Sequence, residues 1–144
     1  MATDRSYPEI RDAVAKLCAN FPGEYWRSLD QDNAYPTAFV QALTEAGYLS
    51  VLIPETYGGS GLPLEAACAV LEEIQRSGGN GGACHAQMYT MGTLLRHGSE
   101  AQKQRYLPAI ADGSLRLQAF GVTEPTSGTD TSRITTTAVR DGSD

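Results

Sequence analysis

The sequence predicts a mostly α-helical fold, in which an N-terminal helical bundle is followed by the first strands of a β domain. Up to Gly113, apolar residues recur at helical spacing and capping residues stand between the stretches. Beyond Gly113 the helical stripe disappears, and residues 133–140 are rich in Thr, Ile and Val, which favour strands. We therefore place a helical domain at residues 1–114 and the incomplete start of a β domain at 115–144.

Capping residues mark the first helix. Ser6 is the expected N-cap, with Pro8 in the first turn and Glu9 completing a capping box. Pro22-Gly23 is expected to end this helix. We interpret the polar stretch around Asp30 to Asn33 as a linker.

Four further helices are expected, each separated from the next by Gly or Pro. Gly47 is expected as the left-handed cap of the first, and Ser99 to Gln102 is a capping-box pattern that opens the last. After Gly47, the segment Tyr48 to Ile53 is interpreted as an extended connection to the next helix. The helices are expected over Pro36 to Ala46, from Pro63 to Gly78, over Ala83 to His97, and from Ser99 to near Tyr106, with one more turn at Pro108.

The helix that begins at Pro63 has two distinct faces. Ala67, Val70 and Ile74 recur on one side, and we expect them in the core. Glu72 and Glu73 fall on the side that should face water.

Composition excludes several classes of function. The net charge of -6 with scattered Lys and Arg argues against a nucleic-acid partner, and no window approaches the ~20 apolar residues of a membrane span. The three cysteines are widely spaced, which suits buried thiols in a reducing compartment. Cys84-His85 are adjacent and form no chelating helical face. We expect a cytoplasmic protein without a metal site.

The segment Phe120 to Asp130 combines a strand end, a turn at Pro125, and a Gly between small polar residues. Such a loop can turn N–H groups and hydroxyls toward a pyrophosphate, although its composition alone favours a solvated turn. The order of residues adds a second argument. An aromatic residue, then Val-Thr-Glu-Pro, then a closing Gly-Thr-Asp resembles the flavin-binding signature of the acyl-CoA dehydrogenase family.

Three further segments resemble the same family in the same order, namely Gly47 to Gly61, Gly98 to Pro108, and Ala111 to Gly113. The resemblance implies an FAD-dependent enzyme that oxidises an acyl-CoA to the 2,3-enoyl-CoA. This chain would supply its N-terminal helical domain and the start of its middle, β-barrel-like domain. The resemblance also implies a homo-oligomer that passes electrons to an electron-transferring flavoprotein.

The resemblance further implies which residues bind the cofactor. Phe120 would lie beside the isoalloxazine ring, and Val122 and Thr123 would hydrogen-bond its pyrimidine edge. Gly128 and Thr129 would approach the FAD pyrophosphate, and Thr129 would also touch the acyl-CoA. The family more often has Tyr or Leu at the position of Phe120 and Ser at that of Thr129. Thr keeps the hydroxyl and adds a methyl group.

The substrate and the catalytic base are also implied by the resemblance. Tyr89, on the helix Ala83 to His97, would line the acyl pocket and limit the chain length, while most of that helix is ordinary core. Glu124 is a candidate for the catalytic base, but in this family the base is a different Glu, which lies in a C-terminal helical domain. We therefore expect no catalytic residue in this chain and a structural role for Glu124.

The end of the sequence leaves two alternatives open. Asp141-Gly142 is a hairpin-turn signal, yet only Ser143 and Asp144 follow it. From this we expect a truncated chain that is inactive alone. One alternative is a non-catalytic fragment or split subunit that needs a companion chain. The other is a different flavin oxidase or monooxygenase on the same scaffold.

Overall fold

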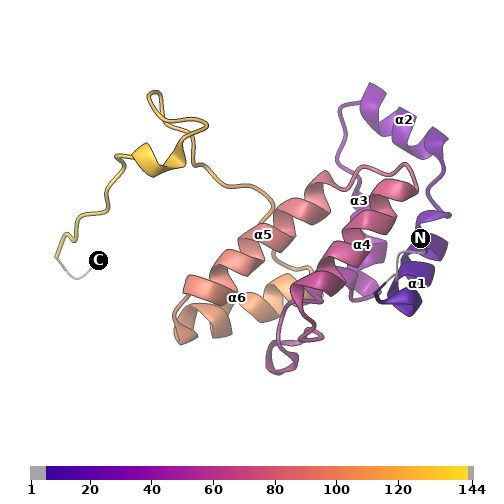
Figure 1. The fold of residues 1–144 in the computed structure, drawn as a ribbon, viewed down its shortest axis with the longest axis horizontal. Helices are drawn as coiled ribbons and strands as arrows, with labels where there is room; N and C mark the ends of the chain where they lie inside the picture. Colours follow the sequence, from indigo (N-terminus) through magenta and orange to yellow (C-terminus); the bar gives the residue numbers. More distant parts are fainter. Residues whose placement is uncertain (1–5, 143–144) are drawn as a thin grey trace.

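The computed structural model describes residues 6–142. Figure 1 shows the helices gathered in one body, from which the residues after α6 run outward as an extended arm. Within the described range no residue forms a β-strand. The α-helices are α1 (Pro8–Cys18), α2 (Gly23–Gln31), α3 (Thr37–Glu45), α4 (Leu64–Arg76), α5 (Gly82–His97) and α6 (Glu100–Asp112), and the 3₁₀ helices are η1 (Tyr48–Ser50), η2 (Glu55–Tyr57) and η3 (Thr131–Arg133).

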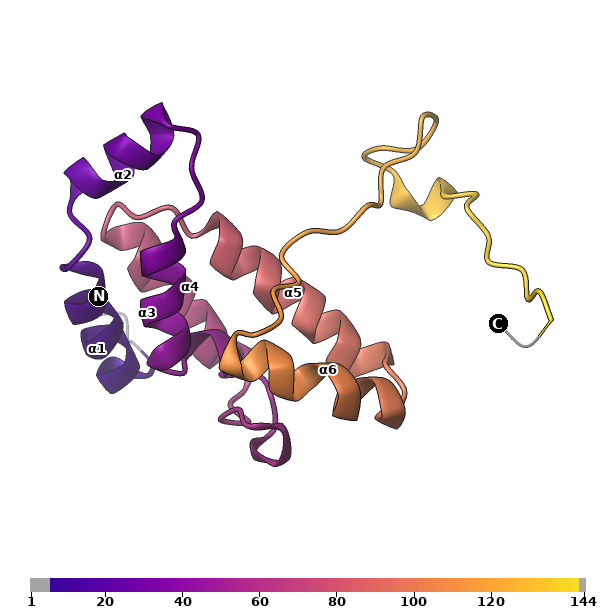
Figure 2. The same ribbon diagram turned by 180° about the vertical axis from the view of Figure 1, so that it is seen from behind.

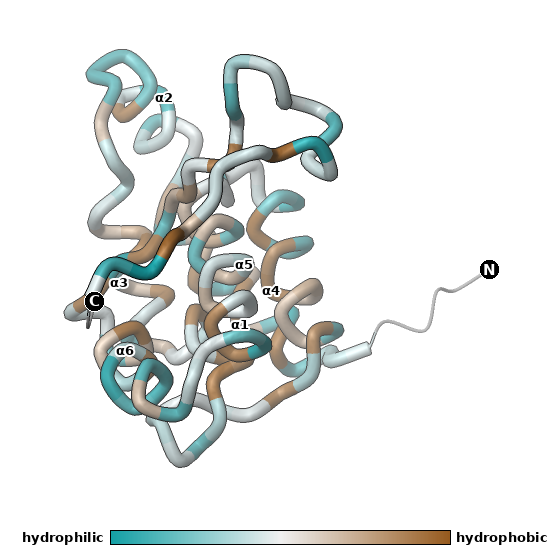
Figure 3. Tube along the Cα trace, turned by 90° about the vertical axis from the view of Figure 1, so that its left-hand side faces the viewer, coloured by the Kyte–Doolittle hydropathy of each residue, from teal (hydrophilic) through white to brown (hydrophobic). Residues whose placement is uncertain are grey.

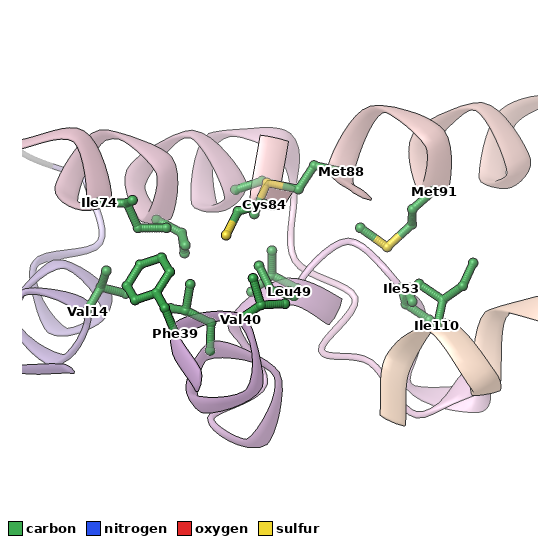
Figure 4. Packing of buried hydrophobic residues seen from close by; sticks show 14 of the residues in the cluster. Val14, Phe39, Val40, Leu49, Ile53, Ile74, Cys84, Met88, Met91 and Ile110 are labelled. Atoms are coloured by element: carbon green, nitrogen blue, oxygen red, sulfur yellow. The ribbon is translucent and has the colours of Figure 1, made fainter. Parts of the chain in front are cut away.

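The core lies between α4 and α5 on one side and α3, α6 and η1 on the other. Figure 4 shows Val14, Phe39 and Ile74 meeting near one end, and Met91 with Ile110 near the other. Each of these side chains is fully buried, and burial of one large apolar side chain stabilises the fold by about 1.5–3 kcal/mol. Hydrophilic residues gather on α2 and α6 at the edge of the body (Figure 3). The helical bundle predicted for this part of the chain is confirmed.

The expected capping box at Ser6 is wrong. The N-cap of α1 is Tyr7, in a left-handed conformation (φ 60°), and no side chain caps the helix. The turn at Tyr7 separates Ser6 from the free N–H groups of α1, and the Ser6 carbonyl accepts a bond from Arg11 Nε instead (2.8 Å).

The expected linker contains a helix that the sequence interpretation missed. Asp30 and Gln31 are the last two residues of α2, and Asp32 is its C-cap. Its anchors are aromatic, since the Trp26 ring packs edge-on against Phe39 (4.8 Å between centroids) and its Nε1 donates to the Phe21 carbonyl (3.0 Å). Helices are predicted from aliphatic residues that recur at helical spacing, and α2 lacks such a stripe.

The segment Tyr48 to Ile53 is compact, so the expected extended connection is wrong. It forms η1 and a following turn, and Leu49 and Ile53 are buried. The next loop closes against it, with the Gly61 N–H donating to the Ile53 carbonyl (2.8 Å). The apolar run therefore marks a core-filling turn. Gly47, which precedes it, has the expected left-handed conformation (φ 79°).

The last helix is longer than predicted. The capping box of Ser99 and Gln102 is confirmed, with bonds of 3.3 and 2.8 Å. Instead of ending near Tyr106, α6 continues through Pro108 to Asp112. Leu107 and Ile110 are both buried on either side of the proline, and their packing offsets the lost N–H bond.

Two expectations about solvent exposure are also corrected. Glu73 of α4 was expected in water, but it is only 6% exposed. Arg11 of α1 lies 3.0 Å from its carboxylate, which allows α1 to pack over this face of α4. Cys68, expected as a buried thiol, lies exposed on the same helix, whereas Cys18 and Cys84 are buried.

The predicted strands are not formed in the described residues. Residues 115–123 and 133–140 have no strand assignment, and Glu124 and Ser127 form an isolated bridge. A strand needs a partner for its backbone groups, and no second strand is present among residues 6–142. The β domain remains a prediction. Gly142 has the positive φ expected of the turn (63°), but residues 143–144 lie outside the described range.

Candidate functional site

The arm begins with a sharp return at Gly113. This glycine has φ 82°, and a Cβ there would lie 2.7 Å from Arg116 Nη2 and 2.8 Å from Thr44 Cγ2. The left-handed backbone conformation favours glycine here, and a Cβ would also displace the Arg116 and Thr44 side chains. The return lets Arg116 reach back to α3, where its Nη1 donates to Thr44 Oγ1 (2.8 Å).

Two glutamines fix the arm to the helical body. Gln87 of α5 is fully buried, and its Nε2 donates to the Leu49 carbonyl (3.3 Å). Its Oε1 accepts from Gln118 Nε2 on the arm (3.0 Å). The Tyr35 hydroxyl donates to Gln118 Oε1, and Thr90 Oγ1 donates to the Leu117 carbonyl. None of these residues was predicted from the sequence, although a Gln between the apolar residues Ala86 and Met88 was a usable signal.

An aromatic row follows along α5. The rings of His85 and Tyr89 meet edge-on with centroids 5.3 Å apart, and those of Tyr89 and Phe120 at 4.9 Å. Tyr89 is half-buried, while Phe120 is 61% exposed. The structure thus brings together two of the residues proposed from the sequence, one on a helix and one on the arm.

The loop beyond Phe120 is closed by its own hydrogen bonds. The Glu124 carboxylate accepts from the Thr136 N–H (2.7 Å) and from the N–H and hydroxyl of Thr135 (3.0 Å each). These bonds, those of Thr136 foremost, lower the pKa of Glu124 to about 2. Ser127 is buried, and its hydroxyl donates to the Asp130 carbonyl (2.6 Å). A carboxylate held in this way is a poor proton acceptor near neutral pH.

The remaining predicted site residues lie on this loop and are open. Val122 is half-buried and Thr123 exposed. Thr129 is also exposed, and neither threonine hydroxyl has a hydrogen bond among the described residues. Gly128 has no heavy atom within 4 Å of the position of a Cβ. Figure 2 shows the loop standing away from the helices, so the structure does not bring these residues onto Tyr89.

A separate hollow of about 740 Å³ lies between α2 and the turn that joins α4 to α5. Trp26, Tyr35 and Asn80 are among its lining residues. None of them was predicted from the sequence as a site residue.

Between residues 6 and 142, no helix combines the length and the apolar character that crossing a membrane requires.

Comparisons with known proteins identify the helical body. A family model described as the N-terminal domain of acyl-CoA dehydrogenase matches residues 5–114. Acyl-CoA dehydrogenase FadE12 of Mycobacterium tuberculosis is 37% identical over 149 aligned residues, which cover 99% of this chain and 38% of the relative. Glutaryl-CoA dehydrogenase of Desulfococcus multivorans is 35% identical, with 90% of this chain and 33% of the relative covered. This chain therefore spans less than two fifths of the length of these relatives.

A solved structure agrees with these relatives. The crystal structure of an acyl-CoA dehydrogenase from Geobacillus kaustophilus superposes with a TM-score of 0.79 at 28% identity. The match covers 93% of this chain and 35% of that one. The helical body, the family model and the relatives agree, and the chain belongs to the acyl-CoA dehydrogenase family.

Proposed function

We propose that this chain is the N-terminal part of a flavin-dependent acyl-CoA dehydrogenase, which oxidises an acyl-CoA thioester to the 2,3-enoyl-CoA. FAD, when bound, supplies the acceptor for the hydride. The observation that carries this proposal is the loop from Phe120 to Asp130. It follows directly on a helical domain of this family, is closed by the Glu124 carboxylate, and leaves its signature residues open.

The residues on the loop fit the flavin. An exposed Phe120 ring offers a face to the isoalloxazine. The Thr123 hydroxyl, which has no partner within the described residues, is free to bond the pyrimidine edge together with the Val122 backbone. The space around Gly128 lets the backbone approach the pyrophosphate, and the Thr129 hydroxyl would donate to it.

The acyl group would lie on the α5 side of the same site. Tyr89 and Phe120 meet at their edges, so the tyrosine stands next to the residue assigned to the flavin. We assign Tyr89 to the wall that limits acyl-chain length, and Thr129 to a contact with the acyl-CoA.

The base that removes the α-proton would come from the C-terminal helical domain of the family. Glu124, the carboxylate on the loop itself, has a pKa lowered to about 2 by the bonds from Thr136 and Thr135. The chain would therefore hold and orient FAD and substrate, and it would be inactive in dehydrogenation alone. The complete enzyme would be a homo-oligomer that passes electrons to an electron-transferring flavoprotein.

A second candidate is a subunit that works only with a companion chain. The arm favours it, because strand-forming residues 133–140 have no partner strand in the described range and are exposed. Both candidates place the flavin on the same loop. Activity that appears only when a second polypeptide is added would favour the subunit that needs a companion chain over the N-terminal part of a longer enzyme.

The proposal is tested by loading the chain with FAD and adding acyl-CoA esters of increasing length in the absence of oxygen. We expect some esters to shift the visible spectrum of the bound flavin, and free CoA to have no such effect. Tyr89→Ala should extend the shift to longer esters, while Thr93→Ala on the same helix should not. An FAD-loaded chain whose spectrum no acyl-CoA changes would contradict the assigned substrate.

A further inference from the structure

Gln87 is an unusual residue for its position. It lies fully buried on α5, between Ala86 and Met88, which are also buried. An amide removed from water is costly unless both of its ends find partners. Here the two ends are bonded to different parts of the molecule, the Leu49 carbonyl in the body and Gln118 on the arm.

The two bonds fix which way the amide points. The Leu49 carbonyl accepts, so it must face the Gln87 NH₂ group. That orientation leaves Oε1 toward the arm, where it can only accept, and Gln118 meets it with a donor (3.0 Å). The other end of Gln118 accepts from the Tyr35 hydroxyl. A chain of three side chains thus joins the α2–α3 connection, the arm and the centre of α5.

Neighbouring contacts hold the same short stretch of the arm. Arg116 bonds to Thr44 of α3 (2.8 Å), and the Leu117 carbonyl accepts from Thr90 of α5. After Gln118 the chain is free of such bonds to the body until Phe120 meets Tyr89. Side chains two residues apart lie on the same side of an extended chain, so Gln118 and Phe120 both turn toward α5.

We infer that Gln87 and Gln118 form a latch that sets the position of Phe120 against Tyr89, and that both glutamines are positioning residues of the site. The value of this position for catalysis rests on the proposed function, whereas the latch itself does not. Without the bond between the glutamines, the arm would remain attached at Arg116 and Leu117 and, through the Tyr35 hydroxyl, at Gln118. Gln118 would lose its contact with α5, so it would no longer hold Phe120 against Tyr89.

The test substitutes the exposed end of the latch. Gln118→Ala lies outside the helices, so helical circular dichroism should show that the body still folds, while the loss of a partner for the buried Gln87 Oε1 should lower its melting temperature. We expect the nuclear Overhauser contacts between the Tyr89 and Phe120 rings to be lost. Gln104→Ala, on the exposed side of α6, is the matched control and should keep them. Gln87→Met should also lose the ring contacts, because it keeps the length of the side chain and removes both bonds.

Ring contacts that persist in Gln118→Ala, or that are missing from the unaltered chain, would overturn the latch. FAD retention is measured on the same samples. If the unaltered chain retains FAD, Gln118→Ala should retain less. If it retains none while the ring contacts still depend on Gln118, the latch stands and the proposed function fails at its cofactor.

Discussion

Glu124 shows how one side chain holds the proposed cofactor loop. It joins the start of the loop to Thr135 and Thr136, so the loop is closed without a neighbouring strand. Its pKa falls from the usual 4.5 to about 2, chiefly through the bonds from Thr136. A lowered pKa means that the closed loop favours the ionised form. We therefore expect the contribution of Glu124 to loop closure to be fully present above about pH 4.5 and to be lost as the pH falls through about 2.

Glu124→Gln should open the loop at neutral pH and remove this pH dependence. The amide keeps one acceptor oxygen but loses the charge that strengthens all three bonds. The amide proton shifts of Thr135 and Thr136 report the change, and in the unaltered chain they should move only at low pH. Glu65→Gln, on the exposed start of α4, is the control. Unchanged Thr135 and Thr136 shifts in Glu124→Gln would contradict the closure.

The three cysteines should differ sharply in reactivity. Burial raises the pKa of Cys84 to about 12 and also raises that of Cys18, whereas Cys68 is exposed. Because the thiolate is the reactive form, a disulfide-exchange reagent at mildly alkaline pH should modify one thiol quickly and the other two only on unfolding. Cys68→Ser should remove the fast phase. Fast modification of two or three thiols in the folded chain would contradict the burial of Cys18 in α1 and Cys84 in α5.

At the scale of elements, the sequence predicts helices best where a stripe and a cap coincide. α3, α4, α5 and the start of α6 are predicted for this reason. α2 was missed because it is anchored by aromatic rings, and the end of α6 was missed because burial of Leu107 and Ile110 outweighs the proline. Both depend on contacts with residues distant in sequence, which a local pattern does not contain.

Two glycines should respond in opposite ways to substitution, Gly59 in the loop after η2 and Gly92 in α5. A Cβ on Gly59 would lie 2.0 Å from the Ile53 carbonyl oxygen and 2.5 Å from that of Ser50. Backbone atoms cannot yield, so Gly59→Ala should destabilise the fold by about 3 kcal/mol. Gly92→Ala, in α5 with no atom within 4 Å, should stabilise it by about 0.5–1 kcal/mol. Urea unfolding measures both, and equal effects would contradict the packing of this loop.

For the whole molecule, the predicted site is in two parts. Tyr89 of α5 and Phe120 of the arm meet at their edges, while Thr123, Gly128 and Thr129 lie on a loop away from the body. The motif residues were found from their order in the sequence. The bond between Gln87 and Gln118 was not predicted, because the two glutamines are 31 positions apart in the sequence and only the fold brings them together. The predicted strands are not formed within residues 6–142, where no partner strand is present, so the β domain stays a prediction.

The loop from Phe120 to Asp130 is proposed as a ready-made part of a flavin site next to this helical domain. The most direct test titrates FAD into the purified chain and follows the flavin fluorescence and the flavin retained after gel filtration. We predict quenched fluorescence and retained flavin in the unaltered chain, and weaker retention in Gly128→Val, whose side chain would fill the space left for the pyrophosphate. A chain with normal helical circular dichroism that neither quenches nor retains FAD would contradict the claim.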